Sequence, residues 1–274
     1  MEFDDIFNIE GDFIPGIYNY CDAWCERCLY VDRCRNFASR KVIEREIEAK
    51  EKRKKSIEEN KNFWNQVNRT IEDAAEIIDE EFPLTKGNYD FLFEDSEYDE
   101  DSEEAMMEHK EKRRKATNHY ITKVADRYEK STHKWFEDKK EILIQDYNSE
   151  TEELVVSCPG IVKESDIKQL TESVSLIRWY EMQIYVKIIR ALSSNFAELE
   201  DADLSEGFPK DSDGSAMVAL LGIDRSIGAW NILLGMLKEE KDNIWTIIKM
   251  LLWLRMEIEK TFPDARNFVW PPKV

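Results

Sequence analysis

Glycine and proline are both scarce in this sequence, with 9 and 7 residues among 274. All-β folds need many tight turns and therefore many of these residues, so their scarcity argues against such folds and favours long helices with few connections. Hydrophobic residues make up 42% of the chain, which is enough for a real core. We therefore expect an all-α fold, a bundle of about five main helices of which several are long.

Positive charge is also in short supply, because 39 lysines and arginines face 58 aspartates and glutamates for a formal net charge of -19. A field of this sign repels nucleic acid phosphates and anionic lipid surfaces. The composition therefore predicts a protein that binds neither nucleic acid nor membrane. Any protein partner is expected to present a basic surface.

A secretory signal and a long hydrophobic run are both missing. The first thirteen residues are acidic, whereas a signal peptide needs a basic start and an apolar run. The stretch 244–256 is apolar but is interrupted by Lys249 and Arg255 and is too short to span a bilayer. We expect a cytoplasmic protein, in which clustered cysteines indicate metal or redox chemistry before disulfides.

Motifs that would name a reaction are absent as well. No Walker loop, dinucleotide fingerprint, nucleophile elbow or zincin motif occurs. A di-iron site of the Glu-x-x-His type is excluded, because Met106, Ala116 and Lys130 stand three residues before the only histidines. No substrate or reaction follows from the sequence.

Hydrophobic spacing places the helices. A Cys-rich segment, 1–39, is expected to precede a helical bundle, 40–274, with an acidic loop near 86–104. Asp213 is expected to cap the fourth helix, whose small residues permit close contact with a neighbour. The predicted helices are 36–81, 103–147, 165–197, 215–237 and 242–262, with a short extended piece at 154–160.

Four of the five cysteines form one cluster, with the spacing C-x3-C-x2-C-x5-C. The thiolate is the ligating form, and a bound metal lowers thiol pKa values enough to populate it at neutral pH. We therefore predict a four-thiolate metal site. Its ligands are Cys21, Cys25, Cys28 and Cys34, whereas Cys158 is expected to be a structural cysteine.

The local backbone decides which metal fits. In an unbroken helix Cys21 and Cys28 would lie about 10 Å apart. A single zinc ion needs its sulfurs about 3.8 Å apart, so a helix would favour the larger [4Fe–4S] cluster. If the segment is instead a knuckle and loop, zinc fits well. In either case the chain must turn between Cys28 and Cys34.

Family resemblances add a little. The spacing from Cys25 to Cys34 resembles the end of the cluster-binding segment of iron–sulfur DNA glycosylases, but the first spacing differs and their helix-hairpin-helix pattern is missing. The spacing from Cys21 to Cys28 also matches the radical S-adenosylmethionine signature, whose (β/α) barrel this helical chain does not offer. The wider string YCDAWCERC, with Arg33-Cys34, resembles an N-terminal signature of uncharacterised bacterial helical proteins, which implies a metal or cluster site and no established reaction.

Three functions remain open at this point. The first is an iron–sulfur protein whose cluster is structural or carries electrons. The second is a redox enzyme that combines the cluster with a polar pocket in the bundle. The third is a zinc-stapled interaction protein without catalysis. The pocket of the second would need Arg178, Glu181, Asp224 and Arg225 to converge.

The arginines near the cysteines have two interpretations. Arg27, Arg33 and Arg35 either offset the negative charge of a thiolate-bound centre or form surface pairs with the neighbouring acidic residues. Surface pairs are the more common arrangement. The expected acidic partners are Asp22, Glu26 and Asp32.

Overall fold

The computed structural model describes residues 11–53, 100–148, 153–200 and 210–269. The chain divides into two compact units. The first unit comprises Met1–Tyr18 and Trp24–Met106, and the second comprises Asn19–Ala23 and Met107–Val274.

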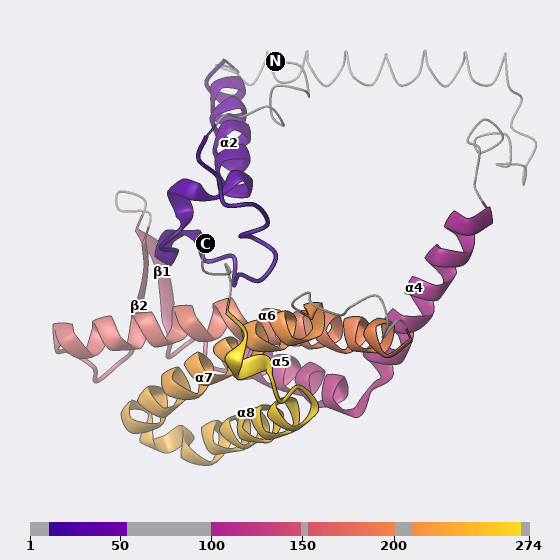
Figure 1. Ribbon diagram of the computed structural model, residues 1–274. Coiled ribbons are helices and arrows are strands. Elements are labelled where there is room, and N and C mark those ends of the chain that lie inside the picture. The colour runs from indigo at the N-terminus through magenta and orange to yellow at the C-terminus, as the bar shows by residue number, and fades with distance from the viewer. Residues whose placement is uncertain (1–10, 54–99, 149–152, 201–209, 270–274) are drawn as a thin grey trace, which may run out of the picture. The chain divides into compact units, whose positions relative to one another are not determined.

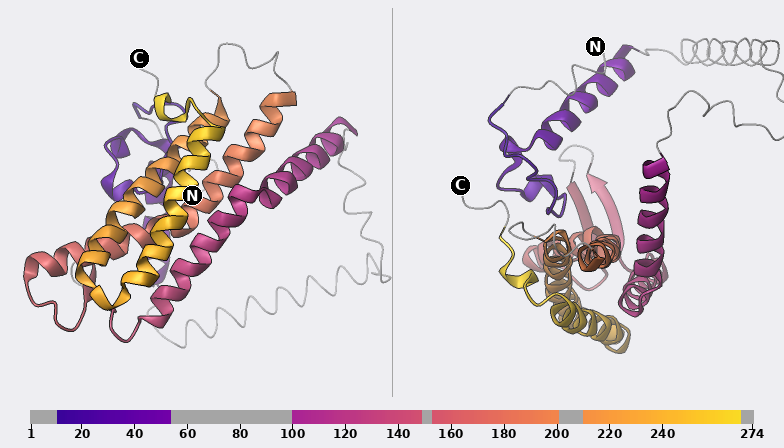
Figure 2. Two further views of the ribbon diagram at one scale, coloured as in Figure 1. Left: turned by 90° about the horizontal axis from the view of Figure 1, so that it is seen from below. Right: turned by 45° about the vertical axis from the view of Figure 1, so that its right-hand side comes forward.

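Four helices of the second unit form a bundle (Figures 1 and 2). They are α5 (Tyr120–Asp138), α6 (Glu164–Glu200), α7 (Asp211–Met236) and α8 (Lys241–Thr261). Helix α6 packs against α5 and α7, and α8 packs against the same two helices, so the four close a ring around one core. The all-α fold class expected from the sequence is confirmed.

The apolar spacing of the helices explains this packing. In α5 the buried positions recur every three or four residues, from Ile121 through Ala125 and Tyr128 to Trp135. The ring of Trp135 meets that of Trp230 from α7 edge-on, with centroids 5.1 Å apart. Edge-on aromatic pairs of this kind stabilise a core beyond their buried area. The aromatic contact fixes α5 and α7 across the bundle.

Helix α7 is the most apolar of the four. Among the described helices it alone has the length and composition of a membrane span, and half of its apolar window is buried inside the bundle. The apolar stretch considered in the sequence as a membrane span, 244–256, lies in α8 instead. A central place in the core accounts for the apolar character of α7, because a helix buried on most sides needs no polar face.

The second predicted helix, 103–147, is wrong because it breaks at His119 and ends in a strand. It is two helices, α4 (Glu100–Asn118) and α5, since His119 adopts an extended backbone with φ -64° and ψ 145°. The imidazole Nδ1 of His119 accepts the backbone N–H of Ile121 at 3.4 Å, which caps α5. The acidic run at 94–104 is also not all loop, because α4 begins at Glu100.

The end of that predicted helix is a strand. Strand β1 (Ile144–Asn148) pairs antiparallel with β2 (Glu153–Ser157), with Ile144 opposite Ser157. The hydroxyl of Thr171 in α6 accepts the backbone N–H of Val156 at 2.9 Å, which joins the hairpin to the bundle. The extended piece predicted at 154–160 is therefore confirmed as far as Ser157, whereas residues 159–160 form a turn and the partner strand is not predicted.

The last three predicted helices are confirmed as α6, α7 and α8. Helix α7 begins at Asp211, however, with Lys210 before it making no side-chain cap. Asp213 is thus a buried residue of the first turn, and its predicted role as the cap is wrong. A carboxylate in this turn still interacts favourably with the helix dipole. A single 3-10 turn, Lys238–Glu240, joins α7 to α8.

The first unit contains α2 (Arg35–Arg53) and the beginning of α4. Helix α2 corresponds to the start of the predicted helix 36–81. The remainder of that prediction, from residue 54 on, lies outside the described residues, as does most of the acidic loop near 86–104. The domain boundary expected at residue 39 stays a prediction.

Candidate metal centre

The cysteine segment is not a helix. Two short 3-10 turns, Cys25–Arg27 and Val31–Arg33, are its only regular elements. Ala23 adopts a positive φ of 56°, which residues with a side chain rarely occupy. The chain turns at residues 29–30, between Cys28 and Cys34, as convergence of the four sulfurs requires. The backbone is therefore a series of turns and not the unbroken helix that was one of the two expectations.

Backbone hydrogen bonds fix two cysteines of the first unit. The backbone N–H of Tyr30 donates to Sγ of Cys28 at 3.4 Å. The carbonyl of Cys34 accepts the N–H of Ala38 at 3.0 Å, so Cys34 stands at the start of α2. Cys25, Cys28 and Cys34 are all partly exposed.

Local contacts of the first unit hold this loop in shape. The backbone N–H of Ile14 donates to the carbonyl of Arg33 at 3.0 Å, and the Arg33 guanidinium pairs with Asp12 at 3.2 Å. The guanidinium of Arg27 lies 4.2 Å from the centre of the Trp24 ring. Surface interactions thus occupy Arg33 and Arg27, although with partners other than those expected.

Residues Asn19–Ala23, which we call the strap, belong to the second unit. The ring of Tyr20 packs edge-on against Phe268 at 4.9 Å. Gly214 of α7 permits this position, because a Cβ there would lie 2.5 Å from the Tyr20 ring. The carbonyl of Asn19 accepts a hydrogen bond from Arg190 at 3.2 Å. The bundle therefore holds the chain directly before Cys21.

Asp22 holds the chain directly after Cys21. Its carboxylate accepts hydrogen bonds from the Tyr180 hydroxyl at 2.5 Å and from Arg225 at 2.8 Å. Its carbonyl accepts the indole N–H of Trp179 at 2.9 Å. Burial, and then the hydrogen bond to Asp22, raise the pKa of Tyr180. Cys21 is thus fixed on both sides by contacts within the second unit.

A second polar cluster lies beside the strap. Asp211 accepts hydrogen bonds from Arg190 at 2.6 Å and from Ser194 at 2.6 Å. Burial alone would raise the pKa of Asp211, but these hydrogen bonds hold it below its usual value. Burial and a hydrogen bond with Asp211 raise the pKa of Tyr20 to about 12. The phenol of Tyr20 therefore stays protonated over the physiological pH range.

The donor set suits a thiophilic metal. Four thiols are the ligands that structural zinc and iron–sulfur clusters use. The structure places Cys21 in the second unit and the other three in the first. Across the part of the chain that the structure describes, no group of three or more His, Cys, Asp or Glu side chains is arranged to hold a metal ion.

The polar residues of the proposed enzyme pocket do not converge. Arg178 pairs with Glu181 at 3.4 Å and lies over the Phe136 ring, whereas Arg225 pairs with Asp22. Asp224 belongs to a third group with Arg266. The four side chains therefore serve three separate ion-pair networks.

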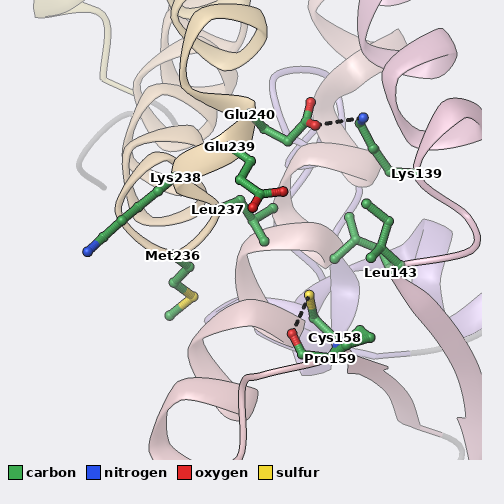
Figure 3. A pocket seen from close by; sticks show the side chains of 10 residues that line it. Lys139, Leu143, Cys158, Pro159, Met236, Leu237, Lys238, Glu239 and Glu240 are labelled. Atoms are coloured by element: carbon green, nitrogen blue, oxygen red, sulfur yellow. Dashed lines mark hydrogen bonds and ion pairs between the residues drawn. The ribbon is translucent and has the colours of Figure 1, made fainter.

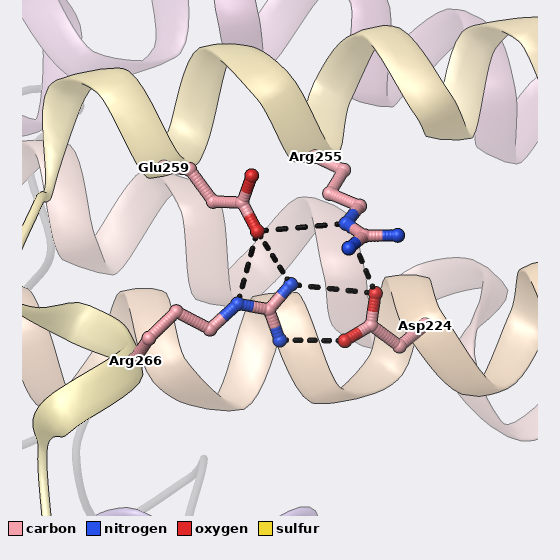
Figure 4. A network of polar contacts seen from close by, with 4 residues as sticks. All are labelled: Asp224, Arg255, Glu259 and Arg266. Carbon is pink, nitrogen blue, oxygen red and sulfur yellow. Dashed lines mark hydrogen bonds and ion pairs between the residues drawn. The ribbon is translucent and has the colours of Figure 1, made fainter.

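The third network joins three elements of the second unit (Figure 4). Arg266, in the 3-10 turn Ala265–Asn267, pairs with Asp224 of α7 at 2.5 Å and with Glu259 of α8 at 2.7 Å. Arg255 adds contacts of 3.5 Å to both carboxylates. All four side chains are partly exposed, so the network is a surface clamp and not a binding pocket.

A pocket of about 330 Å³ does exist elsewhere in the second unit (Figure 3). One wall carries the ion pair between Lys139 and Glu240, at 2.7 Å. Cys158 lines it as a buried residue, and burial raises the pKa of its thiol. None of the four residues expected to form the enzyme pocket lines it. A thiol with a raised pKa is a poor nucleophile, which fits the structural role predicted for Cys158.

Sequence reasoning found the cysteines and missed the groups around them. The surface-pair interpretation of the sequence expects an arginine near the cysteines as the partner of Asp22. The structure pairs Asp22 with Tyr180 and Arg225. Lys187 of α6, whose charge interacts with Cys21, was not singled out. No local pattern marks either residue, because each faces a segment more than 150 positions away.

Comparison with known proteins adds no assignment. No family model, no curated protein and no solved structure matches this chain.

Proposed function

We propose that the four clustered cysteines hold a metal centre with a structural role. The donor set carries the proposal, because four of the chain's five cysteines fall between residues 21 and 34. Two further features support it. The chain turns after Cys28, and a backbone N–H, that of Tyr30, donates a hydrogen bond to Sγ of Cys28, as is usual around metal-bound sulfur.

Zinc is the ion that this backbone suits best. A [4Fe–4S] cluster is the leading expectation from the sequence, and the objection to zinc is that an unbroken helix would keep Cys21 and Cys28 about 10 Å apart. The segment consists of turns, so that objection to zinc no longer applies. The two-residue spacing between Cys25 and Cys28 is also typical of structural zinc sites. A [4Fe–4S] cluster is the second candidate, supported by the spacing from Cys25 to Cys34.

The centre would act by closing a loop of the chain. Zinc has no redox chemistry, and a site closed by four thiolates leaves no position for a substrate. Its binding free energy becomes folding free energy of the segment that supplies the ligands. The redox-enzyme alternative lacks support, because its polar residues lie in separate networks.

Composition supports the setting of this centre. A reducing cytoplasm keeps thiols available as ligands. The net charge of -19 favours a protein partner with a basic surface and disfavours nucleic acid and anionic membranes. We infer a cytoplasmic protein whose zinc-stapled N-terminal segment takes part in protein interaction.

Metal analysis of the full-length protein tests the proposal. The protein is purified anaerobically, and zinc, iron and acid-labile sulfide are measured per chain. We expect a colourless protein with about one zinc per chain. Cys25→Ser should lose the metal, whereas Cys158→Ser, the matched control, should keep it.

Each other result has a defined meaning. A brown protein with iron and acid-labile sulfide would replace zinc by the cluster. Wild-type protein without metal, or metal content that Cys25→Ser leaves unchanged, would reject the four-cysteine centre altogether.

A further inference from the structure

The strap runs antiparallel to a stretch of α6. Its first residue, Asn19, bonds Arg190, whereas Asp22 bonds Trp179 and Tyr180. Tyr180 and Arg190 are about 15 Å apart along the helix, and three strap residues span about 10 Å. The long side chains of Tyr180 and Arg190 bridge the remaining distance of about 5 Å between the roughly 15 Å of helix and the roughly 10 Å of strap. Cys21 therefore faces the part of α6 between these two anchors.

Lys187 occupies that part of α6. It follows Tyr180 by seven residues and precedes Arg190 by three, so the three share one helix face within about 80°. The side chain is half-buried. Its ammonium group interacts electrostatically with Cys21 and Asp22 of the strap, with Arg190 of α6 and with Asp211 of α7.

The carboxylates near Lys187 are already engaged by other cations. Asp211 pairs with Arg190 at 2.6 Å, and Asp22 pairs with Arg225 at 2.8 Å. Lys187 itself makes no ion pair within 4 Å to any residue of the described ranges. Burial of a lysine without a paired carboxylate is unfavourable and uncommon.

We propose that Lys187 balances the charge of the four-cysteine centre through Cys21. This inference rests on the proposed function. Four thiolates around one divalent ion carry an excess of about two negative charges. A fixed ammonium group beside one ligand lowers the cost of gathering them. Groups just outside the ligand shell commonly change metal affinity by about 10- to 100-fold.

The role predicts two opposite effects of one substitution. Lys187→Met keeps the length of the side chain and removes its charge. Without metal, the variant should be at least as stable as wild type, because no ammonium group is buried. With metal, it should bind zinc about 10- to 100-fold more weakly. A residue with only a packing role would not lower metal affinity while leaving the metal-free protein intact.

Zinc affinity of the full-length variants, measured by competition with a chromophoric chelator, tests the inference. Thermal melting of the chelator-treated proteins gives their stability without metal. Lys187→Arg should bind within about threefold of wild type, because it keeps the charge. Lys168→Met, which removes an exposed lysine of the same helix, is the matched control and should bind as wild type does.

The two proposals fail in different ways. Lys187→Met with wild-type affinity, in a protein whose zinc depends on Cys25, would overturn the role of Lys187 alone. Lys187→Arg that binds zinc as weakly as Lys187→Met would overturn that role as well. Absence of zinc from wild type, or zinc that survives Cys25→Ser, would reject the centre and the role of Lys187 with it.

Discussion

The hydroxyl of Tyr180 donates a hydrogen bond of 2.5 Å to the carboxylate of Asp22, a residue 158 positions earlier in the chain. Tyr180 is 1% exposed, so its hydroxyl depends on this partner and on Arg225, which also contacts it. The bond fixes the strap directly after Cys21. It joins a buried core residue of the bundle to the neighbour of a proposed metal ligand.

Tyr180→Phe should loosen the strap and leave the bundle folded. Asp22 would keep Arg225, so the loss in unfolding free energy should be about 1.5 kcal/mol, the value of one hydrogen bond to a charged group. Urea denaturation measures this loss. Hydrogen exchange at residues 19–23 should become faster, while the core of α6 stays protected.

Tyr185→Phe is the matched control for this prediction. Tyr185 lies on the same helix, and its hydroxyl makes no hydrogen bond to the described residues. Its removal should change neither stability nor exchange at the strap. Equal exchange at residues 19–23 in Tyr180→Phe and wild type would show that Asp22 does not depend on Tyr180.

Two glycines of α7 should respond to alanine in opposite directions. A Cβ at Gly222 would lie 2.8 Å from the Tyr180 ring and 3.2 Å from Ile184, whereas a Cβ at Gly228 would meet nothing within 4 Å. Gly222→Ala should therefore lower the unfolding free energy by about 1–3 kcal/mol through overpacking. Gly228→Ala should raise it by about 0.5–1 kcal/mol, because alanine is the better helix former.

Urea titration of both variants measures these changes. Stabilisation by both substitutions would mean that α6 and α7 are not in close contact at Gly222. Destabilisation by Gly228→Ala would mean that its open surroundings are covered in solution.

The helices of the bundle could be predicted because their signal is local. Apolar residues in α6 and α8 repeat at helical spacing, and acidic or charged connections separate the helices. The close contact at Gly222 also followed from the sequence, since glycine inside a helix usually has a packing reason. The break at His119 carries no such signal, because neither glycine nor proline marks it. The hydroxyl of Thr122 bonds the carbonyl of Ala116 across the break, and that bond exists only in the folded turn.

Strand β1 shows a second limit of local reasoning. Its five residues follow a helical pattern without interruption, and only pairing with β2 makes them extended. The start of α7 shows a third. Asp211, Ser212 and Asp213 are all good capping residues, and the sequence cannot rank them. The true start depends on Glu198 of α6, which accepts the backbone N–H of Ser212 at 3.0 Å.

In the candidate site, too, only the features with a local signal could be predicted from the sequence. Spacing alone led to the proposal of Cys21, Cys25, Cys28 and Cys34 as ligands, because ligands of one centre often cluster in sequence. The partners of the strap could not be identified, since Tyr180 and Arg225 lie 158 and 203 positions from Asp22. Contacts between distant segments need either coordinates or many related sequences.

Cys158 should be the slowest thiol to alkylate. It is buried, burial raises its pKa, and only the thiolate reacts. A raised pKa means less thiolate at any given pH. Its alkylation rate should therefore stay low at pH 8 and rise only above the ordinary thiol pKa of about 8.5. Mass mapping of iodoacetamide adducts in chelator-treated protein, between about pH 7 and pH 10, measures the rate.

Cys28 serves as the internal reference for that experiment. It is partly exposed, so in metal-free protein the reagent can reach it without local unfolding. If Cys158 reacts as fast as Cys28 at pH 7, its burial beside the pocket is wrong.

Arg266 should stabilise the bundle in a manner that depends on salt. It pairs with Asp224 and Glu259 and so links the C-terminal 3-10 turn to both α7 and α8. The side chains are partly exposed, which limits the expected loss in Arg266→Met to about 1 kcal/mol at low salt. The loss should shrink in 1 M NaCl, where the screening length falls from about 10 Å to about 3 Å.

Two further variants separate geometry from charge at this clamp. Arg266→Lys keeps the charge but loses the planar fork that reaches two carboxylates, so it should recover only part of the lost stability. Lys130→Met removes one exposed pair within α5, with Asp126, and should lower stability less than Arg266→Met does. Guanidinium would itself screen charge, so urea is the denaturant for all three. A loss in Arg266→Met that is the same at both salt concentrations would assign the role of Arg266 to packing of its aliphatic stem.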